Sequence, residues 1–364
     1  MSLEKKPIRI LIAGGGTGGH LFPGMAIAEE FAEKRNCMIR FVGTKRGIET
    51  KIIPSSPYGL YTIPVSGLYR VGLKKKIATL FKLPIAFLKS LLILLSFRPH
   101  LVIGIGGYAS GPILALSILF RKRTVLQEQN AFPGMTNRLL GKYVKLAFIP
   151  FSQSQHLFKN PVVVGNPIRK VISQSIDEIT ETPADRFTFA IIGGSQGAHI
   201  LNKTMVDSLQ RLSQLSQKIH IIHQTGKNDY QWVLSEYANY PDLDAQISEF
   251  VDDMAALYKQ SHLLICRAGS MINEIIAMGR ASILVPIEVS SGNHQKENAK
   301  TMSDAGAAIM IEERDLSANL LFETIQGLIE KPDRISKMGE YAKRLYKGNS
   351  AQKIVAAILE KFHL

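Results

Sequence analysis

Residues 14–31, GGGTGGHLFPGMAIAEEF, follow the apolar run IRILIA at residues 8–13, and together they decide the expected fold. An apolar run that ends in glycines and leads into an amphipathic pattern predicts a strand, a tight turn and a helix. Such a turn aims backbone N–H groups and the positive end of the helix at one point, which suits an anion, above all phosphate. His20 lies at the expected helix start. The stretch therefore predicts a phosphate-binding turn with an imidazole beside it.

Glycines at such a turn have a second explanation, because a tight strand-to-helix turn needs them for backbone reasons alone. The chain, however, has three glycine loops of this kind, at residues 14–19, 104–111 and 193–197. Each follows a strand-like run, so all three should lie at the carboxyl ends of their strands, where ligands bind in open α/β folds.

Strand-like and helical patterns alternate along the whole chain, which predicts parallel sheets with right-handed crossovers. The pattern restarts near residue 187, where FAIIGGSQGAHILN repeats the order of the opening stretch. We expect an α/β protein with two Rossmann-like, doubly wound units, residues 1–165 and 166–364, joined by a hinge at Gly165, Asn166 and Pro167. The last helical run, residues 350–364, is left open between the two units. The strand-like runs are 8–13, 39–42, 101–105, 124–126, 144–148, 162–164, 187–192, 219–223, 263–265 and 283–285.

Composition indicates a globular protein, because 364 residues with a 46% hydrophobic fraction are enough for two soluble cores. The apolar run at residues 8–13 is too short for a signal peptide, so we expect a cytosolic chain. Cys37 and Cys266 lie far apart and in no metal-ligand spacing, so we expect reduced packing residues.

The positive charge is concentrated in the first half of the chain. Residues 1–165 carry 23 Lys and Arg against 6 Glu and no Asp, whereas residues 166–364 carry 21 against 24 acidic residues. Such a field favours an anionic partner, either nucleic acid or an anionic lipid surface. No aromatic-bearing strand platform, zinc-finger pattern or helix-turn-helix pattern is found, so we expect no nucleic-acid partner.

The stretch YRVGLKKKIATLFKLPIAFLKSLLILLSFRPH, residues 69–100, has two interpretations. Two lysines and a proline interrupt its apolar run, so it is not expected to span a bilayer. It is either a core helix with a solvated basic edge or a helix that turns apolar residues and lysines toward an anionic membrane.

Two common nucleotide-binding classes do not fit. A dinucleotide fold requires an acidic residue at the end of the second strand, but that strand ends in Gly43 and Thr44. A kinase-type P-loop is not supported either, because no G-x-x-x-x-G-K-[ST] sequence occurs.

Seven motifs resemble, in order and spacing, those of the MurG family of bacterial peptidoglycan glycosyltransferases: GGTGGHLFPGMAIA, GIGGYASGP, EQNAFPGMTNRLL, VVGNPIR, GGSQGAHILN, FVDDMAALY and GNHQKENA. The resemblance runs from residue 15 to about residue 308. It implies the GT-B fold, with two Rossmann-like domains facing a cleft. It also implies inverting transfer of N-acetylglucosamine from UDP-N-acetylglucosamine to the 4-hydroxyl of the muramoyl sugar of lipid I, which gives lipid II.

The resemblance also implies roles for residues of the C-terminal unit. Its donor-binding positions are Arg169, Ser195, Val251, Ser270, Met271, Glu274 and Gln295. Ser195 would meet the diphosphate, the backbone of Val251 would read uracil, and Arg169 would approach the base. Glu274, placed with the catalytic residues, would accept two hydrogen bonds from the ribose diol. The motif that contains Glu274 is one residue shorter than R-x-G-A-x-T-x-x-E and lacks its threonine, so the resemblance implies the role of Glu274 more directly than the contacts of Ser270 and Met271.

In the N-terminal unit the resemblance makes His20 the catalytic base, whose ordinary pKa near 6.5 suits proton transfer from an alcohol. Thr17, Gly18 and Gly19 would contact donor or acceptor phosphate. Tyr108 and Asn130 would line the acceptor side, with Asn130 also counted toward the donor. His199, the equivalent histidine of the second unit, is expected to be structural.

We expect metal-independent chemistry and no cofactor, with the leaving charge taken by loop amides. The one D-x-D sequence, Asp242 to Asp244, is expected to form a turn. The expected partners are UDP-N-acetylglucosamine, lipid I and the anionic inner leaflet, which would make the chain a peripheral protein on the cytoplasmic face of the membrane. Three alternatives stay open: a GT-B transferase for a glycolipid or small aglycone, a nucleotide-sugar binding module without catalysis, and a basic membrane scaffold.

Overall fold

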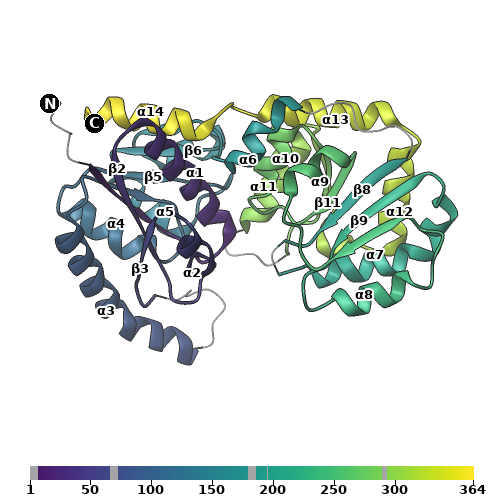
Figure 1. The fold of residues 1–364 in the computed structure, drawn as a ribbon, viewed down its shortest axis with the longest axis horizontal. Coiled ribbons are helices and arrows are strands. Elements are labelled where there is room, and N and C mark those ends of the chain that lie inside the picture. The colour runs from purple at the N-terminus through teal and green to yellow at the C-terminus, as the bar shows by residue number, and fades with distance from the viewer. Residues whose placement is uncertain (1–6, 66–72, 179–185, 195, 289–292) are drawn as a thin grey trace. The chain divides into compact units, whose positions relative to one another are not determined.

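The computed structural model describes residues 7–65, 73–178, 186–194, 196–288 and 293–364, with the backbone alone for residues 73–81. The chain divides into two compact units. The first comprises Met1–Arg169 together with Lys347–Leu364, and the second comprises Lys170–Tyr346. Each unit contains one parallel sheet with its helices packed around it (Figure 1).

The first unit has a seven-stranded sheet in the order β3-β2-β1-β4-β5-β6-β7, and all of its paired strands are parallel. Its strands are β1 (Ile8–Ala13), β2 (Cys37–Gly43), β3 (Gly59–Thr62), β4 (Leu101–Gly104), β5 (Thr124–Gln127), β6 (Leu146–Ile149) and β7 (Pro161–Val163). Its helices are α1 (Gly18–Lys34), α2 (Glu49–Ile52), α3 (Leu73–Phe97), α4 (Ser110–Leu119), α5 (Met135–Leu140) and α14 (Ser350–Phe362).

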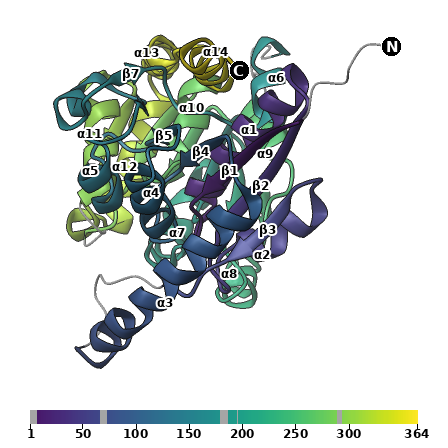
Figure 2. The same ribbon diagram turned by 90° about the vertical axis from the view of Figure 1, so that its left-hand side faces the viewer.

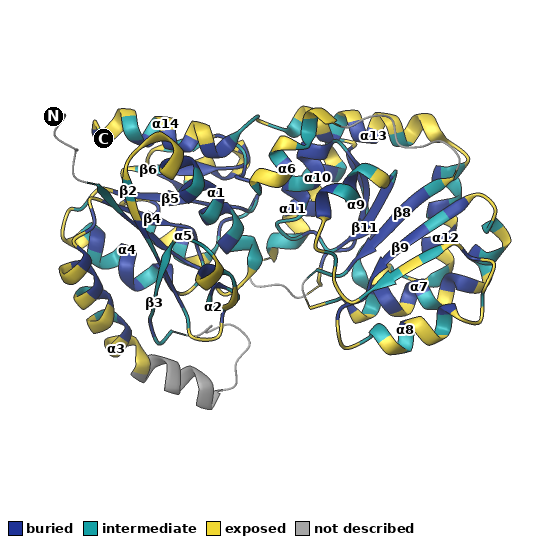
Figure 3. Ribbon diagram, in the orientation of Figure 1, coloured by how far each residue is buried: buried dark blue, intermediate teal, exposed yellow. Residues whose placement is uncertain are grey.

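Strand β1 shows why helices cover both faces of this sheet. Successive side chains of a strand point to opposite faces, and every side chain from Ile10 to Ala13 is fully buried. Ile10 and Ile12 pack in a core with α1 and α14, whereas Leu11 and Ala13 pack in a core with α3 and α4. Figure 2 turns this unit toward the viewer, and Figure 3 colours each residue by burial; β4 and β5 are buried along their whole length.

Helix α14 ends the chain but belongs to the first unit. Ile354 and Ile358 lie in the same core as Phe31 of α1. The hydroxyl of Ser350 donates a hydrogen bond to the carbonyl of Val164, at 2.7 Å. The helix therefore covers one face of the first sheet. The sequence alone did not show which unit this last helical run joins.

The second unit has a six-stranded parallel sheet in the order β10-β9-β8-β11-β12-β13. Its strands are β8 (Phe187–Ile192), β9 (Ile219–Gln224), β10 (Ala245–Ser248), β11 (Leu263–Cys266), β12 (Ala281–Leu284) and β13 (Ala308–Met310). Its helices are α6 (Lys170–Gln174), α7 (His199–Leu212), α8 (Tyr230–Tyr237), α9 (Met254–Gln260), α10 (Ile272–Met278), α11 (His294–Asp304), α12 (Ala318–Ile329) and α13 (Pro332–Leu345). Both sheets thus follow the doubly wound order, which confirms the predicted fold class.

All ten strand-like runs are strands, with ends that differ by at most two residues. Three strands, β3, β10 and β13, were not predicted. All three lie at an edge of their sheet, and most of their residues are only partly buried. An edge strand has one neighbour and needs no continuous apolar run, so its sequence pattern is weak.

Helix α3 is long and contains Pro84. Within the described part of the chain, neither α3 nor any other helix has the length and apolar character needed to cross a membrane.

A buried polar network holds the second unit together behind its glycine loop. His223 on β9 is fully buried and lies 3.1 Å from the Tyr237 hydroxyl through Nδ1 and 3.1 Å from Asn202 Oδ1 through Nε2. The Asn202 amide nitrogen donates to the Thr225 carbonyl and to Asp229, so Oδ1 is an acceptor. The ring therefore carries its proton on Nε2, and Nδ1 accepts from Tyr237. Burial lowers the pKa of His223 to about 3.

This depressed pKa predicts a pH-dependent stability. Because unfolding returns His223 to a pKa near 6.5, the unfolded state binds the additional proton below that pH, and stability falls as the pH drops toward 3. The group should account for about 2 kcal/mol of lost unfolding free energy between pH 7 and pH 5. Urea unfolding of the wild type and of His223→Gln measures this. The variant should be less stable at pH 7 but lose less stability on acidification; equal pH slopes would contradict the assignment.

Candidate active site

The first glycine loop joins β1 to α1 and carries His20. Gly14, Gly15 and Gly16 have φ angles of 152°, 145° and 91°, a region that favours glycine. Helix α1 then begins at Gly18 with Thr17 as its N-cap. The Thr17 hydroxyl lies 3.0 Å from Nδ1 of His20, in the first turn of the helix. The loop therefore places an imidazole, with its orientation fixed by a hydroxyl, beyond the end of β1.

The second glycine loop, after β4, packs directly against the first. A Cβ on Gly106 would lie 2.9 Å from the His20 ring, and a Cβ on Gly107 would lie 2.7 Å from the Gly15 carbonyl. Glycine at these two positions lets the loops approach each other and leaves room for the ring. Tyr108 follows and is 37% exposed. The structure thus brings Tyr108 and His20 to the same end of the first sheet.

Glu128 organises the third segment, after β5. Its carboxylate is buried and accepts hydrogen bonds from five donors. Oε1 accepts from the backbone N–H groups of Gln129 and Asn130 and from the Asn130 side chain, at 2.9 to 3.0 Å. Oε2 accepts from the Gly134 N–H at 3.0 Å and from Asn137 at 2.7 Å. Asn130 is therefore held by its backbone and its side chain.

Arg169 lies at the end of the first unit's long segment, past β7. Its guanidinium carbon lies 5.3 Å from the centre of the Phe22 ring, which belongs to α1. This cation–π contact places Arg169 beside Phe22, which follows His20 by two positions on α1. The expected boundary at residue 165 assigned Arg169 to the second unit; by its contacts it lies with the first.

The third glycine loop, after β8, differs from the first. Ser195 lies outside the described residues. The Gly194 carbonyl accepts a hydrogen bond from the Gln224 side chain at 3.1 Å, and the same amide donates to the Glu249 carbonyl at 3.0 Å. This amide ties the loop to the segment after β10, where Val251 is half-buried. Among the described residues, no atom would lie within 4 Å of a Cβ on Gly194.

The segment after β11 carries Ser270, Met271 and Glu274. Met271 is the N-cap of α10, and Glu274 lies in its first turn. The hydroxyl of Tyr258, a fully buried residue of α9, donates to Glu274 Oε2 at 2.8 Å. The carboxylate is therefore oriented by a buried phenol. Gln295, in the first turn of α11, accepts a hydrogen bond through Oε1 from the Ile287 N–H at 3.1 Å.

The candidate residues share one topological feature. Each described one follows the carboxyl end of a strand in a parallel sheet. In the first unit β1 leads to Thr17, Gly18, Gly19 and His20, β4 to Tyr108, β5 to Asn130 and β7 to Arg169. In the second unit β10 leads to Val251, β11 to Ser270, Met271 and Glu274, and β12 to Gln295. This edge is the ligand-binding edge of open α/β sheets.

Two features have structural partners. His199 is the second unit's equivalent of His20, but its Nδ1 lies 3.0 Å from Asp229 Oδ2, so it forms an ion pair when protonated. Asp244 of the D-x-D sequence is paired with Arg186 at 2.9 Å and with His220 at 3.0 Å. Both arrangements are those of surface charge pairs.

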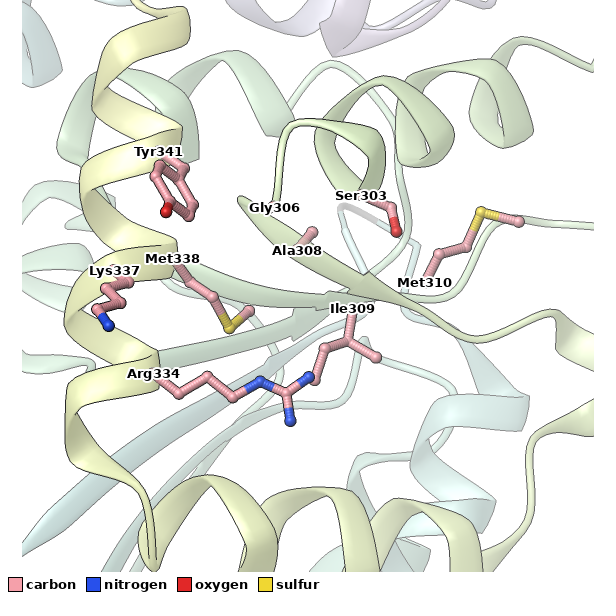
Figure 4. A pocket seen from close by; sticks show the side chains of 9 residues that line it. All are labelled: Ser303, Gly306, Ala308, Ile309, Met310, Arg334, Lys337, Met338 and Tyr341. Atoms are coloured by element: carbon pink, nitrogen blue, oxygen red, sulfur yellow. The ribbon is translucent and has the colours of Figure 1, made fainter.

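A cavity of about 470 Å³ lies elsewhere in the second unit, between α13 and the edge strand β13 (Figure 4). No candidate residue lines it. The lining residues are Ser303, Gly306, Ala308, Ile309, Met310, Arg334, Lys337, Met338 and Tyr341. The two cations among them, Arg334 and Lys337, belong to α13 and not to the strand.

The sequence reasoning missed three residues that position the site: Glu49, Glu128 and Tyr258. For the two glutamates the sequence offers one signal, that residues 1–165 hold only six acidic residues. Their burial is seen only in the structure. Tyr258 closes the motif FVDDMAALY, but nothing in the sequence shows that it faces Glu274.

Comparisons with known proteins agree with this layout. Residues 10–149 match the glycosyltransferase family 28 N-terminal domain, and residues 188–357 match the corresponding C-terminal domain. A UDP-N-acetylglucosamine--N-acetylmuramyl-(pentapeptide) pyrophosphoryl-undecaprenol N-acetylglucosamine transferase of Myxococcus xanthus is 40% identical over 95% of this chain and 91% of its own length. The transferase of the same name from Syntrophus aciditrophicus is 41% identical over 98% and 99%.

Solved structures agree as well. The crystal structure of Acinetobacter baumannii MurG aligns with a TM-score of 0.78 and 27% identity, covering 98% of this chain and all of that one. The glycosyltransferase of kitacinnamycin, at 13% identity and a TM-score of 0.73, shares the fold. The chain therefore belongs to the MurG family of N-acetylglucosamine transferases, within glycosyltransferase family 28.

Proposed function

We propose that the chain transfers N-acetylglucosamine from UDP-N-acetylglucosamine to the 4-hydroxyl of the muramoyl sugar of lipid I, giving lipid II. The observation that carries the proposal is that the described donor and acceptor candidates all lie beyond the carboxyl ends of parallel strands. The names of relatives about 40% identical over nearly the whole chain support the same reaction.

In the proposed reaction His20 is the general base. Its Nε2 takes the proton of the 4-hydroxyl as that oxygen attacks the anomeric carbon, the bond to UDP breaks, and the configuration inverts. For Nε2 to accept a proton, Nδ1 must carry the hydrogen and donate it to the Thr17 hydroxyl, 3.0 Å away. The start of α1 disfavours the imidazolium, which keeps the base neutral before reaction.

The second unit would hold the donor. Glu274, oriented by Tyr258, would accept the two hydroxyls of the ribose. The amides of the loop with Ser195 would take the charge of the diphosphate without a metal ion. Gln295 would meet a sugar hydroxyl, and the backbone of Val251 would meet uracil. In this proposal the base, His20, belongs to the first unit, and Glu274 of the donor site belongs to the second.

The lipid substrate and the basic first unit point to a location at the membrane. Helix α3 offers a surface that could contact the lipid. Ala86, Ile93, Leu94 and Phe97 are buried on one face of this helix. Another face exposes apolar side chains at helical spacing: Ile85, Leu88, Leu92 and Leu95, each more than half exposed. A core helix with a solvated edge does not explain these exposed side chains.

Lys82 and Lys89 are exposed beside this stripe. Apolar side chains flanked by lysines suit the surface of an anionic bilayer, where each cation contributes about 1 kcal/mol. We therefore propose a peripheral position on the cytoplasmic leaflet, with the stripe of Ile85, Leu88, Leu92 and Leu95 against the lipid.

The function is tested by offering labelled UDP-N-acetylglucosamine with lipid I and, separately, with diacylglycerol. We expect product with lipid I alone. Product with diacylglycerol would favour a glycolipid transferase, and a failure of UDP-N-acetylglucosamine to raise the melting temperature would favour a membrane scaffold.

The role of His20 predicts a loss of rate without a loss of donor binding. His20→Ala should lower kcat by about 10² to 10⁴-fold, the usual contribution of a general base, while calorimetry finds the Kd for UDP unchanged. Thr17→Val should lower kcat less, and Thr17→Ser, which keeps the hydroxyl, should retain activity. A His20→Ala variant with full activity would instead indicate a binding module.

The membrane surface predicts a vesicle-binding defect. Leu88→Gln with Leu92→Gln removes two exposed apolar side chains and should weaken binding to phosphatidylglycerol vesicles at least about tenfold. Melting temperature should not change, because both side chains are exposed. Leu234→Gln on α8, 40% exposed, is the matched control and should bind as the wild type does. Equal binding by all three proteins would remove α3 from the proposal.

A further inference from the structure

Glu49 is a buried carboxylate directly beneath the first glycine loop. It is the first residue of α2 and is fully buried. Its Oε2 accepts a hydrogen bond from the Gly16 N–H at 2.8 Å. Its Oε1 accepts from the Thr44 N–H at 2.6 Å and from the Thr44 hydroxyl at 3.1 Å. The carboxylate therefore joins the loop after β1 to the segment after β2.

Three glycines, one in the loop after β1 and two between the end of β2 and α2, make room for this carboxylate. A Cβ on Gly15 would lie 2.7 Å from the Glu49 carboxyl carbon, a Cβ on Gly43 would lie 2.5 Å from Oε1, and a Cβ on Gly47 would overlap the same group. Gly43 and Gly47 do not have positive φ angles. Backbone conformation therefore does not require glycine at these two positions, and the space taken by Glu49 does.

This arrangement fills the place of a ligand. A glycine-rich loop before a helix presents N–H groups to an anion, and here the Gly16 N–H already meets an anion that belongs to the chain. Gly43 ends β2, where dinucleotide folds carry an acid that binds ribose. In this chain the acid near that position is Glu49 of α2, and its carboxylate accepts a hydrogen bond from the glycine loop.

We infer that Glu49 is an internal anion that replaces phosphate in the first glycine loop and acts as the positioning residue for Thr17 and His20. Thr17 directly follows Gly16, so the carboxylate that fixes the Gly16 N–H fixes the start of α1. A phosphate at Gly16 would be repelled by a buried negative charge, so a substrate anion would meet the N–H groups of the first turn, at Gly18 and Gly19. The part concerning catalysis rests on the proposed function; the part concerning the loop does not.

The loop part is tested by a double-mutant cycle on thermal stability. Gly47→Ala should lower the melting temperature of the wild type by several degrees, about 1 kcal/mol or more of overpacking. In a Glu49→Ala background the same change should cost less than about a third as much, because the carboxylate is gone. An equal cost in both backgrounds would overturn the inference.

Anion rescue gives a second readout. In Glu49→Ala, sodium formate should raise the melting temperature more than sodium chloride at the same concentration does, because formate can take the vacated position. The wild type and Glu33→Ala, an exposed glutamate on α1 changed in the same way, should show no such difference. No specific effect of formate on Glu49→Ala would count against an anion site in the loop.

The catalytic part is tested by Glu49→Gln, which turns an acceptor into a donor facing the loop N–H groups. We expect kcat to fall at least about tenfold while KM for UDP-N-acetylglucosamine changes less than about threefold, the pattern of a residue that acts on the base and not on donor binding. Glu33→Gln should be fully active. Wild-type kcat in Glu49→Gln would refute the positioning role. An inactive wild type would instead refute the proposed function, and the cycle and the rescue would still decide the loop part.

Discussion

Two buried carboxylates, Glu49 and Glu128, hold the loops of the first unit in place. A buried charge is costly unless hydrogen bonds replace its hydration, and here most of the donors are backbone N–H groups of the loops themselves. The charge is stabilised only while the loops keep their shape, and the loops keep their shape because the charge is there. Thr17, His20 and Asn130 follow or belong to these loops, so their placement depends on the two glutamates.

The fold could be predicted from the sequence wherever a strand is buried between two neighbours. Strands β1 and β8 match the expected runs at both ends, because a central parallel strand is apolar on both faces. The edge strands β3, β10 and β13 could not be found in the same way. Their side chains are half-exposed, and their place in the sheet is set by one neighbour and by the chain that leads to them.

The candidate site could be predicted for those residues that come directly after a strand in the sequence. Glycine loops, His20 and the motif of Glu274 are local signals, and the parallel topology alone gathers them at one edge of each sheet. Glu49 and Glu128 could not be placed, because most of their partners are main-chain N–H groups, whose positions no residue type records. The packing of Arg169 against Phe22 of the first unit likewise depends on the tertiary structure.

The two units contain the same local motif, but the polar contacts of its loop differ between them. Both place a strand, a glycine loop and a helix with an early histidine in the same order. In the first, Glu49 supplies negative charge to the loop amide of Gly16, and His20 faces a neutral hydroxyl. In the second, the Gln224 amide binds the Gly194 carbonyl, and His199 faces a carboxylate. The Gly16 N–H of the first loop is thus bonded to an anion, whereas the Gly194 carbonyl of the second loop accepts from a side-chain amide and from the Gly197 N–H. A buried anion fills the first loop and a neutral amide ties the second, so the two copies of the motif do not offer an incoming phosphate the same electrostatic environment.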